Sequence, residues 1–374
     1  MSAKTTLERL LAGTDVVFNG PHPWDPQIRD ERAYRRFLLE GSVGAGDSYM
    51  DGWWDAEAPD ELICRLLRER SHGKLLSLPL LFYAALAFVF NLQSRSRAFE
   101  VGKRHYDVGN DLYKAMLDRR MTYTCGYWSS PSGEAKTLDE AQEAKLDLVC
   151  RKIGLKKGDR VLDIGGGWGS FARFAAERYG ASVVAITISK EQAALGRELC
   201  SSLPVDIRLQ DYRDLHDETF DHVVSLGMFE HVGVKNYRTY MHVVRRVLKP
   251  DGLFLLHTIG SNKSLWFADP WIAKRIFPNG MLPSVAQIGK AVEGLFIMED
   301  WHNFGTDYDT TLMAWFSRFD AAWPTLKEKY GERFYRMWKF YLLSCAGGFR
   351  ARNTQLWQIV LSPRGVPGGY RSIR

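Results

Sequence analysis

The stretch Val161–Gly169, VLDIGGGWG, decides the fold of this chain. It overlaps the apolar run Arg160–Ile164, which predicts a buried strand, and it precedes Phe171, Phe174 and Ala175, which recur at helical spacing. Glycines between a strand and a helix let the backbone turn sharply and approach a ligand that a Cβ atom would exclude. The stretch therefore predicts the cofactor loop of an α/β nucleotide-binding fold.

Strands and helices alternate along the chain after this loop. The further predicted strands are Ser182–Ile188, Asp206–Gln210, His222–Leu226 and Leu253–Ile259. We predict helices from Lys190 and over Tyr237–Leu248, and the sequence KPDG at Lys249–Gly252 predicts a turn before the last strand. This alternation is typical of parallel βαβ units in a doubly wound sheet, which binds its ligand at the carboxyl ends of the strands.

The residues of the loop favour S-adenosyl-L-methionine (SAM) over a dinucleotide. Asp163 precedes the glycines, and Trp168 occupies a position where a pyrophosphate would need a small residue. A helix-capping carboxylate is the alternative interpretation of Asp163. The polar residues expected to contact the ribose and the adenine lie at the ends of the second and third strands: Thr187, Gln192, Gln210, Asp211 and Tyr212. We therefore expect an α/β class I SAM-dependent methyltransferase with a Rossmann-like doubly wound sheet and a small N-terminal α-rich module.

Composition excludes several other classes. The chain has 374 residues and a net charge of +6 without a concentrated basic stripe, so we expect no nucleic-acid partner. Its five cysteines form no CxxC pair and no His/Cys metal spacing, which predicts a reduced, cytoplasmic protein without a metal site. The first residues lack the apolar region of a signal peptide, so we do not expect secretion.

The uncharged segment Leu75–Leu92, LLSLPLLFYAALAFVFNL, complicates this soluble picture. Three interpretations are open: a buried or dimer-covered helix, an interfacial helix docked on a membrane, and a span at the lower limit of length. Basic residues on both sides favour a monotopic contact with the inner face of the membrane. We accordingly predict two domains, a membrane-contact and dimerisation module over 1–94 and a catalytic domain with an acyl-chain pocket over 95–374, in a peripherally associated homodimer.

Several long motifs in order resemble those of cyclopropane-fatty-acyl-phospholipid synthases, from about Val101 to the C-terminus. They are HYDVGNDLY (His105–Tyr113), MTYTCGYW (Met121–Trp128), VLDIGGGWG, TISKEQ (Thr187–Gln192), GMFEHVGVKNY (Gly227–Tyr237), LLHTIG (Leu255–Gly260), DPWIAKRIFPNGMLPS (Asp269–Ser284), EDWHNFGTDYDTTL (Glu299–Leu312) and SCAGGFRA (Ser344–Ala351). Two departures are small: Gly166 replaces the family's cysteine, and Tyr123-Thr124 replaces its Tyr-Ser dipeptide. The resemblance adds Tyr123 and Thr124 to the expected cofactor site, beside Gly165, Gly166, Gly167 and Gly169 of the loop.

The resemblance also implies the reaction. The family transfers the SAM methyl group to a cis double bond of a phospholipid acyl chain and then closes a three-membered ring, with bound bicarbonate as the proton acceptor. The residues implied to hold bicarbonate are Cys125, Glu230, His257, Ile259 through its backbone, and Tyr308. Taken alone, a histidine in an apolar strand, a glutamate at a helix start and a buried phenol are ordinary structural residues.

Two further points stay open at this stage. Cys345 lies in the predicted apolar helix Phe340–Ala346, where a chemical role and simple packing near the acyl pocket are both consistent with the sequence. Other functions to consider are a methyltransferase that stops at a methyl or methylene branch and a catalytically silent lipid-binding module. The intact cofactor loop argues against the silent module.

Overall fold

The computed structural model describes residues 2–70, 109–130 and 133–374, and these residues form two compact units. The first unit draws on Met1–Phe90, Trp266–Pro278 and Tyr308–Thr354. The second draws on Asn91–Leu265, Asn279–Asp307 and Gln355–Arg374. The chain thus enters each unit more than once.

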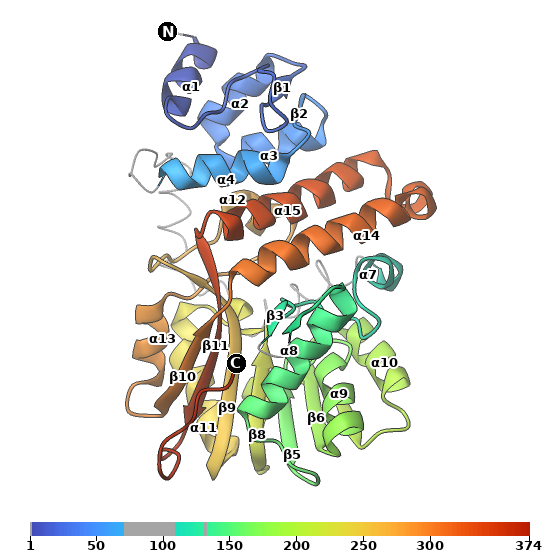
Figure 1. Ribbon diagram of the computed structural model, residues 1–374, viewed down its shortest axis with the longest axis vertical. Helices are drawn as coiled ribbons and strands as arrows, with labels where there is room; N and C mark the ends of the chain where they lie inside the picture. Colours follow the sequence, from blue (N-terminus) through green and yellow to red (C-terminus); the bar gives the residue numbers. More distant parts are fainter. Residues whose placement is uncertain (1, 71–108, 131–132) are drawn as a thin grey trace. The chain divides into compact units, whose positions relative to one another are not determined.

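The second unit contains a seven-stranded sheet in the order β10-β11-β9-β8-β5-β6-β7 (Figure 1). Its strands are β5 (Arg160–Ile164), β6 (Ser182–Thr187), β7 (Val205–Leu209), β8 (Phe220–Leu226), β9 (Leu248–Ser261), β10 (Ile297–Asn303) and β11 (Thr354–Ser362). The pairs β5–β6, β6–β7, β5–β8 and β8–β9 are parallel, and β10 pairs with β11 antiparallel. The predicted doubly wound sheet is confirmed. From β5 the chain adds β6 and β7 on one side and then β8 and β9 on the other.

Helices cover both faces of this sheet. The helices of the second unit are α7 (Asn110–Met116), α8 (Leu138–Lys152), α9 (Ser170–Tyr179), α10 (Lys190–Leu199), α11 (Tyr237–Val247) and α13 (Val285–Val292). Short elements complete it: β3 (Ser129–Ser130), β4 (Gly133–Glu134) and the 3-10 turns η2 (Tyr212–Asp214), η3 (Phe229–His231) and η4 (Val234–Asn236).

Alternate residues of β5 divide the core between the two faces. Val161 packs with residues of α8, α9 and α10, whereas Leu162 and Ile164 pack with residues of α11 and α13. This division follows from the two-residue period of a strand, which directs successive side chains to opposite faces. Because both faces are covered, apolar side chains on both sides of the strand are buried, as is typical of a parallel strand.

One predicted turn is a bulge inside a strand. Lys249–Gly252 lies within β9, where the register with β8 shifts between the pairs Phe220↔Leu248 and His222↔Leu253. A Cβ atom at Gly252 would lie 2.2 Å from the carbonyl oxygen of Asp221, so glycine permits this close approach. The turn residues therefore bulge out of the ladder instead of ending the strand.

The first unit is mainly helical. Its helices are α1 (Ala3–Leu11), α2 (Arg32–Glu40), α3 (Ser42–Met50), α4 (Pro59–Arg70), α12 (Pro270–Arg275), α14 (Thr306–Tyr330, of which the first two residues belong to the second unit) and α15 (Glu332–Arg350). A two-stranded pairing of β1 (Gln27–Ile28) with β2 (Trp54–Asp55) accompanies them. The expected α-rich N-terminal module is thus present.

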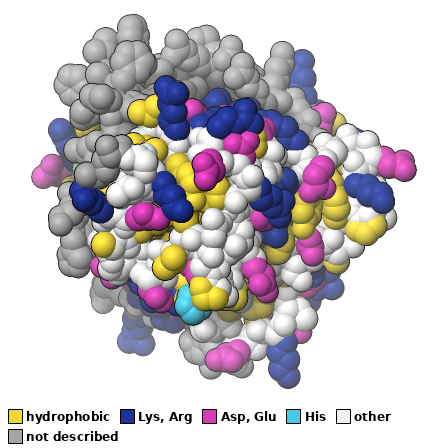
Figure 2. All heavy atoms as spheres, turned by 90° about the horizontal axis from the view of Figure 1, so that it is seen from above, with side chains coloured by type: hydrophobic (Ala, Val, Ile, Leu, Met, Phe, Trp, Pro, Cys, Tyr) yellow, Lys and Arg dark blue, Asp and Glu magenta, His cyan; other side chains and the backbone are white. Residues whose placement is uncertain are grey.

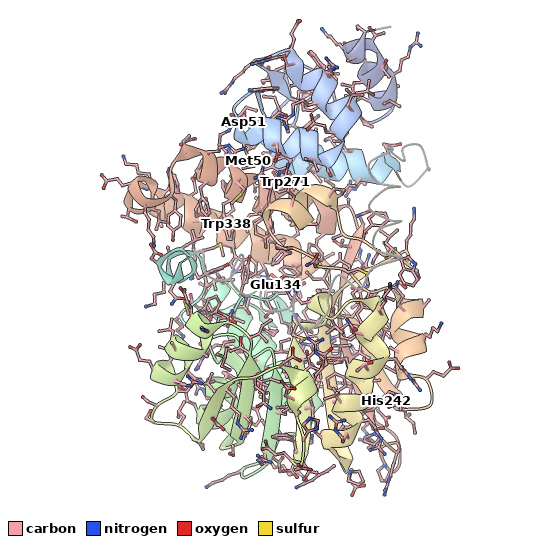
Figure 3. The ribbon with its side chains drawn as sticks, turned by 180° about the vertical axis from the view of Figure 1, so that it is seen from behind. Met50, Asp51, Glu134, His242, Trp271 and Trp338 are labelled. Atoms are coloured by element: carbon pink, nitrogen blue, oxygen red, sulfur yellow. The ribbon has the colours of Figure 1, made fainter. Side chains whose placement is uncertain are left out.

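The glycine-rich stretch Gly41–Gly46 has the composition of a turn, but most of it belongs to α3. The glycines serve close packing: a Cβ atom at Gly46 would lie 2.2 Å from Nε1 of Trp271 in α12. Trp271 is labelled in Figure 3, together with Met50 at the end of α3. Asp47, one residue after Gly46, accepts hydrogen bonds from Lys274 and Arg275 of α12 at 2.9 Å. Steric and ionic contacts therefore join the same two helices.

The segment predicted to contact a membrane is not among the residues that the structure describes. Leu75–Leu92 and the predicted boundary at 94/95 both lie outside the described residues. Among the helices that are described, none has the length and apolar character needed to cross a bilayer. The membrane-contact and dimerisation roles of residues 1–94 stay predictions.

The packing of Gly46 generates a stability prediction. Gly46→Ala should lower the free energy of unfolding by about 1–3 kcal/mol, because the added methyl group overpacks the contact with Trp271. Gly289→Ala in α13 is the matched control, since a Cβ atom at that position would have nothing within 4 Å. That control should be neutral or stabilising by about 0.5–1 kcal/mol. Thermal denaturation checks both variants, and equal melting temperatures would contradict the packing account.

Candidate functional site

One cavity lies at the carboxyl ends of β5, β6 and β8. It collects the expected cofactor residues, with the exception of Gly169: Tyr123, Thr124, Asp163, Gly165, Gly166, Gly167, Trp168, Thr187, Gln192, Gln210, Asp211 and Tyr212. Gly169 instead caps α9 in a left-handed conformation, at φ +80°. The sequence thus predicted which side chains meet at this edge of the sheet, and their individual roles toward SAM stay predictions.

The Gly-rich loop forms the floor of the cavity. Gly165 and Gly167 have φ values of +86° and +56°, which only glycine adopts without strain. The amides of Gly165 and Gly166 donate to the carbonyl of Ile186 at 2.9 and 3.0 Å, which fastens the loop to β6. A Cβ atom at Gly166 would lie 2.7 Å from that of Ala185, so this position has little room for a side chain.

Asp163 is the buried acid of the cavity. Its side chain is 1% exposed, and burial raises its pKa to about 7, with Lys145 acting in the opposite direction. Among the described residues, Oδ1 of Asp163 has no hydrogen-bond partner. A buried carboxyl group that lines a cavity and has an oxygen without a partner suits a cationic ligand group, and SAM carries an ammonium and a sulfonium.

The far side of the cavity has polar groups that engage one another. Thr187 donates its hydroxyl proton to Gln192 Oε1 at 2.8 Å, which leaves the Gln192 amide group for other acceptors. Asp211 accepts two hydrogen bonds from the guanidinium of Arg213, at 2.8 and 2.7 Å. Arg213 also lines the cavity, so the acid predicted to face adenine is already paired with a cation that the sequence analysis did not assign.

A second cluster lies around Glu230, which follows β8 in η3. Its Oε1 accepts a hydrogen bond from the amide of Ile259 at 2.7 Å. No partner for its Oε2 is found in the part of the chain that the structure describes. Burial raises the pKa of Glu230 to about 7, and hydrogen bonds from the amides of Ile259 and Glu230 and from the Thr258 hydroxyl only partly offset this effect. The predicted pair Glu230 and Ile259 is therefore in contact, with the Ile259 amide already used to hold the carboxyl group.

His257 and Cys125 lie close to the cofactor cavity without lining it. His257 is 1% exposed in β9, opposite Leu226 of β8, and its Nδ1 lies 3.3 Å from Nε2 of Gln358. Burial holds the pKa of His257 well below its usual value, so the ring is neutral. The carbonyl of His257 accepts from the amide of Gly227, a cavity residue, at 2.9 Å. Cys125 is fully buried and follows the cavity residue Thr124.

The remaining two predicted residues belong to the first unit. Tyr308 lies in α14 and stacks against Phe349 at a centroid distance of 4.6 Å, with Trp315 edge-on at 5.9 Å. Cys345 lies in α15 and its residue is partly exposed. Desolvation of the thiol by the groups packed around it raises its pKa to about 12. A thiol with this pKa is not a thiolate at neutral pH, which disfavours a nucleophilic role. The assignments of Tyr308 and Cys345 to the site stay predictions.

Sequence reasoning missed three charged or titratable residues of this region. Arg213 and His231 line the cavity, and burial lowers the pKa of His231 to about 4. Lys145 of α8 is fully buried behind Thr124, to which it donates a hydrogen bond. His231 follows Glu230 in a quoted motif and was open to assignment. Lys145 carries no such signal, because a lysine in the polar pattern of a helix normally faces solvent.

The buried carboxyl group of Asp163 predicts that one substitution weakens SAM binding without lowering the thermal stability of the protein. Asp163→Asn should weaken SAM binding about 10- to 100-fold, since a hydrogen bond to a charged group contributes about 1.5–3 kcal/mol. The folded protein binds the Asp163 proton more tightly than the unfolded chain does, so ionisation between about pH 4 and 7 costs stability. The variant should therefore melt at the same or a higher temperature at pH 8.

Calorimetry and thermal denaturation of the free protein at pH 8 check this pair of effects. Asp206→Asn is the control, because Asp206 is an exposed carboxylate of β7 outside the cavity. Unchanged SAM affinity in Asp163→Asn, or a clearly lower melting temperature, would contradict the assignment.

Comparison with known proteins shows the family of this chain. The sequence model of the family described as mycolic acid cyclopropane synthetase matches residues 93–359. The cyclopropane-fatty-acyl-phospholipid synthase of Escherichia coli (strain K12) is 54% identical over 369 residues, which are 98% of this chain and 94% of that protein. Sphingolipid C9-methyltransferase A of Emericella nidulans is 35% identical over 283 residues, covering 72% of this chain and 54% of that protein.

A solved structure adds the cofactor. The mycolic acid cyclopropane synthase CmaA1, complexed with S-adenosylhomocysteine (SAH) and CTAB, superposes with a TM-score of 0.64 at 31% identity, over 70% of this chain and 97% of that one. SAH is what remains of SAM after methyl transfer, so the likeness extends to the cofactor. This chain belongs to the mycolic acid cyclopropane synthetase family, as a SAM-dependent methyltransferase of cyclopropane fatty acid synthesis.

Proposed function

We propose that this enzyme builds the cyclopropane ring on an unsaturated acyl chain of a membrane phospholipid, with bicarbonate as the proton acceptor. SAM supplies an electrophilic methyl group when it is bound. An alkene is a weak nucleophile, so the cavity must hold the double bond in line with that methyl group and keep water away. Ring closure then requires the loss of one proton from the added carbon.

The observation that carries the bicarbonate proposal is the state of Glu230. Its Oε2 is buried without a partner among the described residues, while Ile259 fixes the other oxygen at 2.7 Å. A bicarbonate ion has one O–H group, and a carboxylate oxygen of this kind can accept a hydrogen bond from it. The neutral His257 ring fits beside an anion as a hydrogen-bond donor, because it requires no counter-charge. These residues would hold bicarbonate, and bicarbonate would supply a base for the proton lost on ring closure.

Ile259 enters this proposal in a changed role. The resemblance implied that its backbone contacts bicarbonate, and the structure shows that its amide donates to Glu230 Oε1. We therefore assign Ile259 to the orientation of the Glu230 carboxyl group, which leaves Oε2 to face the ion. Cys125 and Tyr308 complete the proposed set on the resemblance alone.

Glu230→Gln tests the proposal. The amide oxygen of the substituted side chain still offers an acceptor to the Ile259 amide, but the charge and one acceptor are lost. We expect ring formation to fall at least about 100-fold, the scale of a lost transition-state electrostatic contact. SAM affinity should stay within about 2-fold, since Glu230 does not line the cofactor cavity.

The control for this experiment is Glu299→Gln. Glu299 is a carboxylate of β10 that accepts hydrogen bonds from Ser362 and the amide of Val366, apart from the predicted site. Removal of bicarbonate from the buffer should slow the wild-type enzyme and the control, and added bicarbonate should restore both. Full ring formation by Glu230→Gln, or a wild-type rate independent of bicarbonate, would refute the proposal.

A second candidate product is a methyl or methylene branch on the same chain. The 35% identity to a sphingolipid C9-methyltransferase favours keeping it, since that name describes methylation without a ring. Proton magnetic resonance of the lipid product separates the two, because ring protons resonate near the high-field edge of the spectrum. Loss of the double bond without that signal would establish the branched product.

We also propose that the enzyme acts as a peripheral homodimer on the inner face of the membrane. The proposal is supported by the uncharged sequence Leu75–Leu92 between basic residues and by a substrate that resides in a bilayer. Basic, acidic and hydrophobic side chains are interspersed on the face in Figure 2, so the described surface there has no patch of one charge that alone would bind anionic lipid.

Deletion of residues 75–92 tests the membrane role. Activity on phospholipid vesicles should fall at least about 10-fold, as expected when an interfacial segment no longer concentrates the enzyme at its substrate. SAM affinity should not change, and sedimentation of the intact chain should show a dimer. An equal loss of SAM binding would indicate misfolding and would contradict a role confined to the membrane.

A further inference from the structure

Lys145 is a buried cation that the reaction described above does not use. It lies in α8, its side chain is fully buried, and it does not line the cofactor cavity. Its single hydrogen bond among the described residues runs from Nζ to Oγ1 of Thr124, at 2.6 Å. Burying an ammonium group costs free energy of folding, so a buried lysine is expected to have a structural or functional role.

The groups around Lys145 belong to the cavity wall. Lys145 is attracted electrostatically to Asp118, Cys125 and Asp163, and in return it opposes the rise in the pKa of Asp163. Asp163 lines the cavity with a buried Oδ1 that has no partner in the described ranges. Lys145 therefore contacts one group of the cavity wall, the hydroxyl of Thr124, and acts electrostatically on a second, the carboxyl group of Asp163.

The hydrogen bond to Lys145 determines what Thr124 can do. An ammonium group donates and never accepts, so Thr124 Oγ1 must be the acceptor in this contact. No acceptor for the Thr124 hydroxyl proton is found among the residues that the structure covers. Gln142, one turn earlier in α8, also donates to the Thr124 carbonyl at 2.7 Å and so fixes this backbone. The hydroxyl proton of Thr124 is thus available to the cavity.

A hydroxyl donor beside a carboxylate acceptor matches one part of SAM in particular. The α-amino acid end of SAM carries a carboxylate, which accepts hydrogen bonds, and an ammonium, which donates them. The adenosine part has no such pair of opposite charges. We propose that Lys145 is a positioning residue for the amino acid end of SAM, which it serves by orienting the Thr124 hydroxyl as a donor.

This inference rests on the proposed placement of SAM in the cavity, and a ligand pair tests the two separately. 5′-Methylthioadenosine shares the adenosine part with SAM but lacks the amino acid end and the positive charge on sulfur. SAH keeps the amino acid end on a neutral sulfur, so its affinity separates these two differences and should fall as that of SAM does. Lys145→Met keeps the length of the side chain and removes its charge and its donor. It should weaken SAM about 10- to 100-fold and 5′-methylthioadenosine less than about 2-fold, as expected for the loss of charge-assisted contacts to one end of a ligand.

Lys152→Met is the matched control. Lys152 is the other fully buried lysine of α8, two turns further on, and its Nζ contacts Asp300 at 3.6 Å and His302 Nδ1 at 3.0 Å. That variant should keep the ratio of the two affinities, whatever its effect on stability. In turnover, Lys145→Met should raise the KM for SAM while kcat stays within a few-fold.

Thr124→Val provides a second variant in case Lys145→Met does not fold. It removes only the hydroxyl group and should produce the same selective loss of SAM affinity. In the double variant the losses should not add, because both act through one contact. Equal weakening of both ligands, or no weakening, would overturn the role of Lys145. Failure of the wild-type protein to bind SAM would instead refute the proposed cofactor site.

Discussion

The proposed site depends on two carboxyl groups that are buried at one edge of the sheet, where its parallel strands end. Asp163 lies near the end of β5 and Glu230 follows β8, its neighbour in the sheet, and burial raises the pKa of each to about 7. Each has one oxygen without a partner among the described residues. Burying an unsatisfied acid costs stability, so these groups make physical sense only if a ligand engages them.

The two acids differ in what surrounds them, and this separates their tasks. Asp163 faces a cavity and has a lysine behind it, which suits binding of a cation. Glu230 lies outside that cavity, with its carboxyl group held by a backbone amide and a neutral histidine in the adjoining strand. The proposed SAM site and the proposed site of proton transfer can therefore lie at one edge of the sheet without competing for the same charge.

Much of this arrangement was predictable from the sequence, for a simple reason. The parallel strands are apolar runs bounded by polar or glycine residues, and the carboxyl ends of such strands meet at one edge. On this basis the loop residues Asp163–Trp168 and the strand-end residues Thr187 and Asp211 were expected at one edge, and all of them line the cavity there. Their roles toward SAM stay predictions. The helical spacing of α9 and α11 was equally clear, because their buried faces repeat with the helix period.

What the sequence did not reveal depends on contacts between distant segments. Lys145 looks like an ordinary surface cation in a linear pattern, and only the fold brings it to Thr124. The glycines of α3 have the composition of a turn. Their role in close packing is visible only in the fold, where Trp271 of a later segment packs against Gly46. The KPDG stretch has the composition of a turn. That it forms a bulge instead depends on its pairing with the neighbouring strand β8. Local composition carries none of this information.

The most direct measurement of the central claim follows the added carbon through the reaction. SAM labelled with three deuterium atoms on its methyl group is given to the enzyme with vesicles of an unsaturated phospholipid, and the product is examined by mass spectrometry and proton magnetic resonance. Transfer followed by loss of one hydron predicts a product that retains two of the three deuterium atoms and a cyclopropane ring. Retention of all three, or an acyl chain without a ring, would contradict the account.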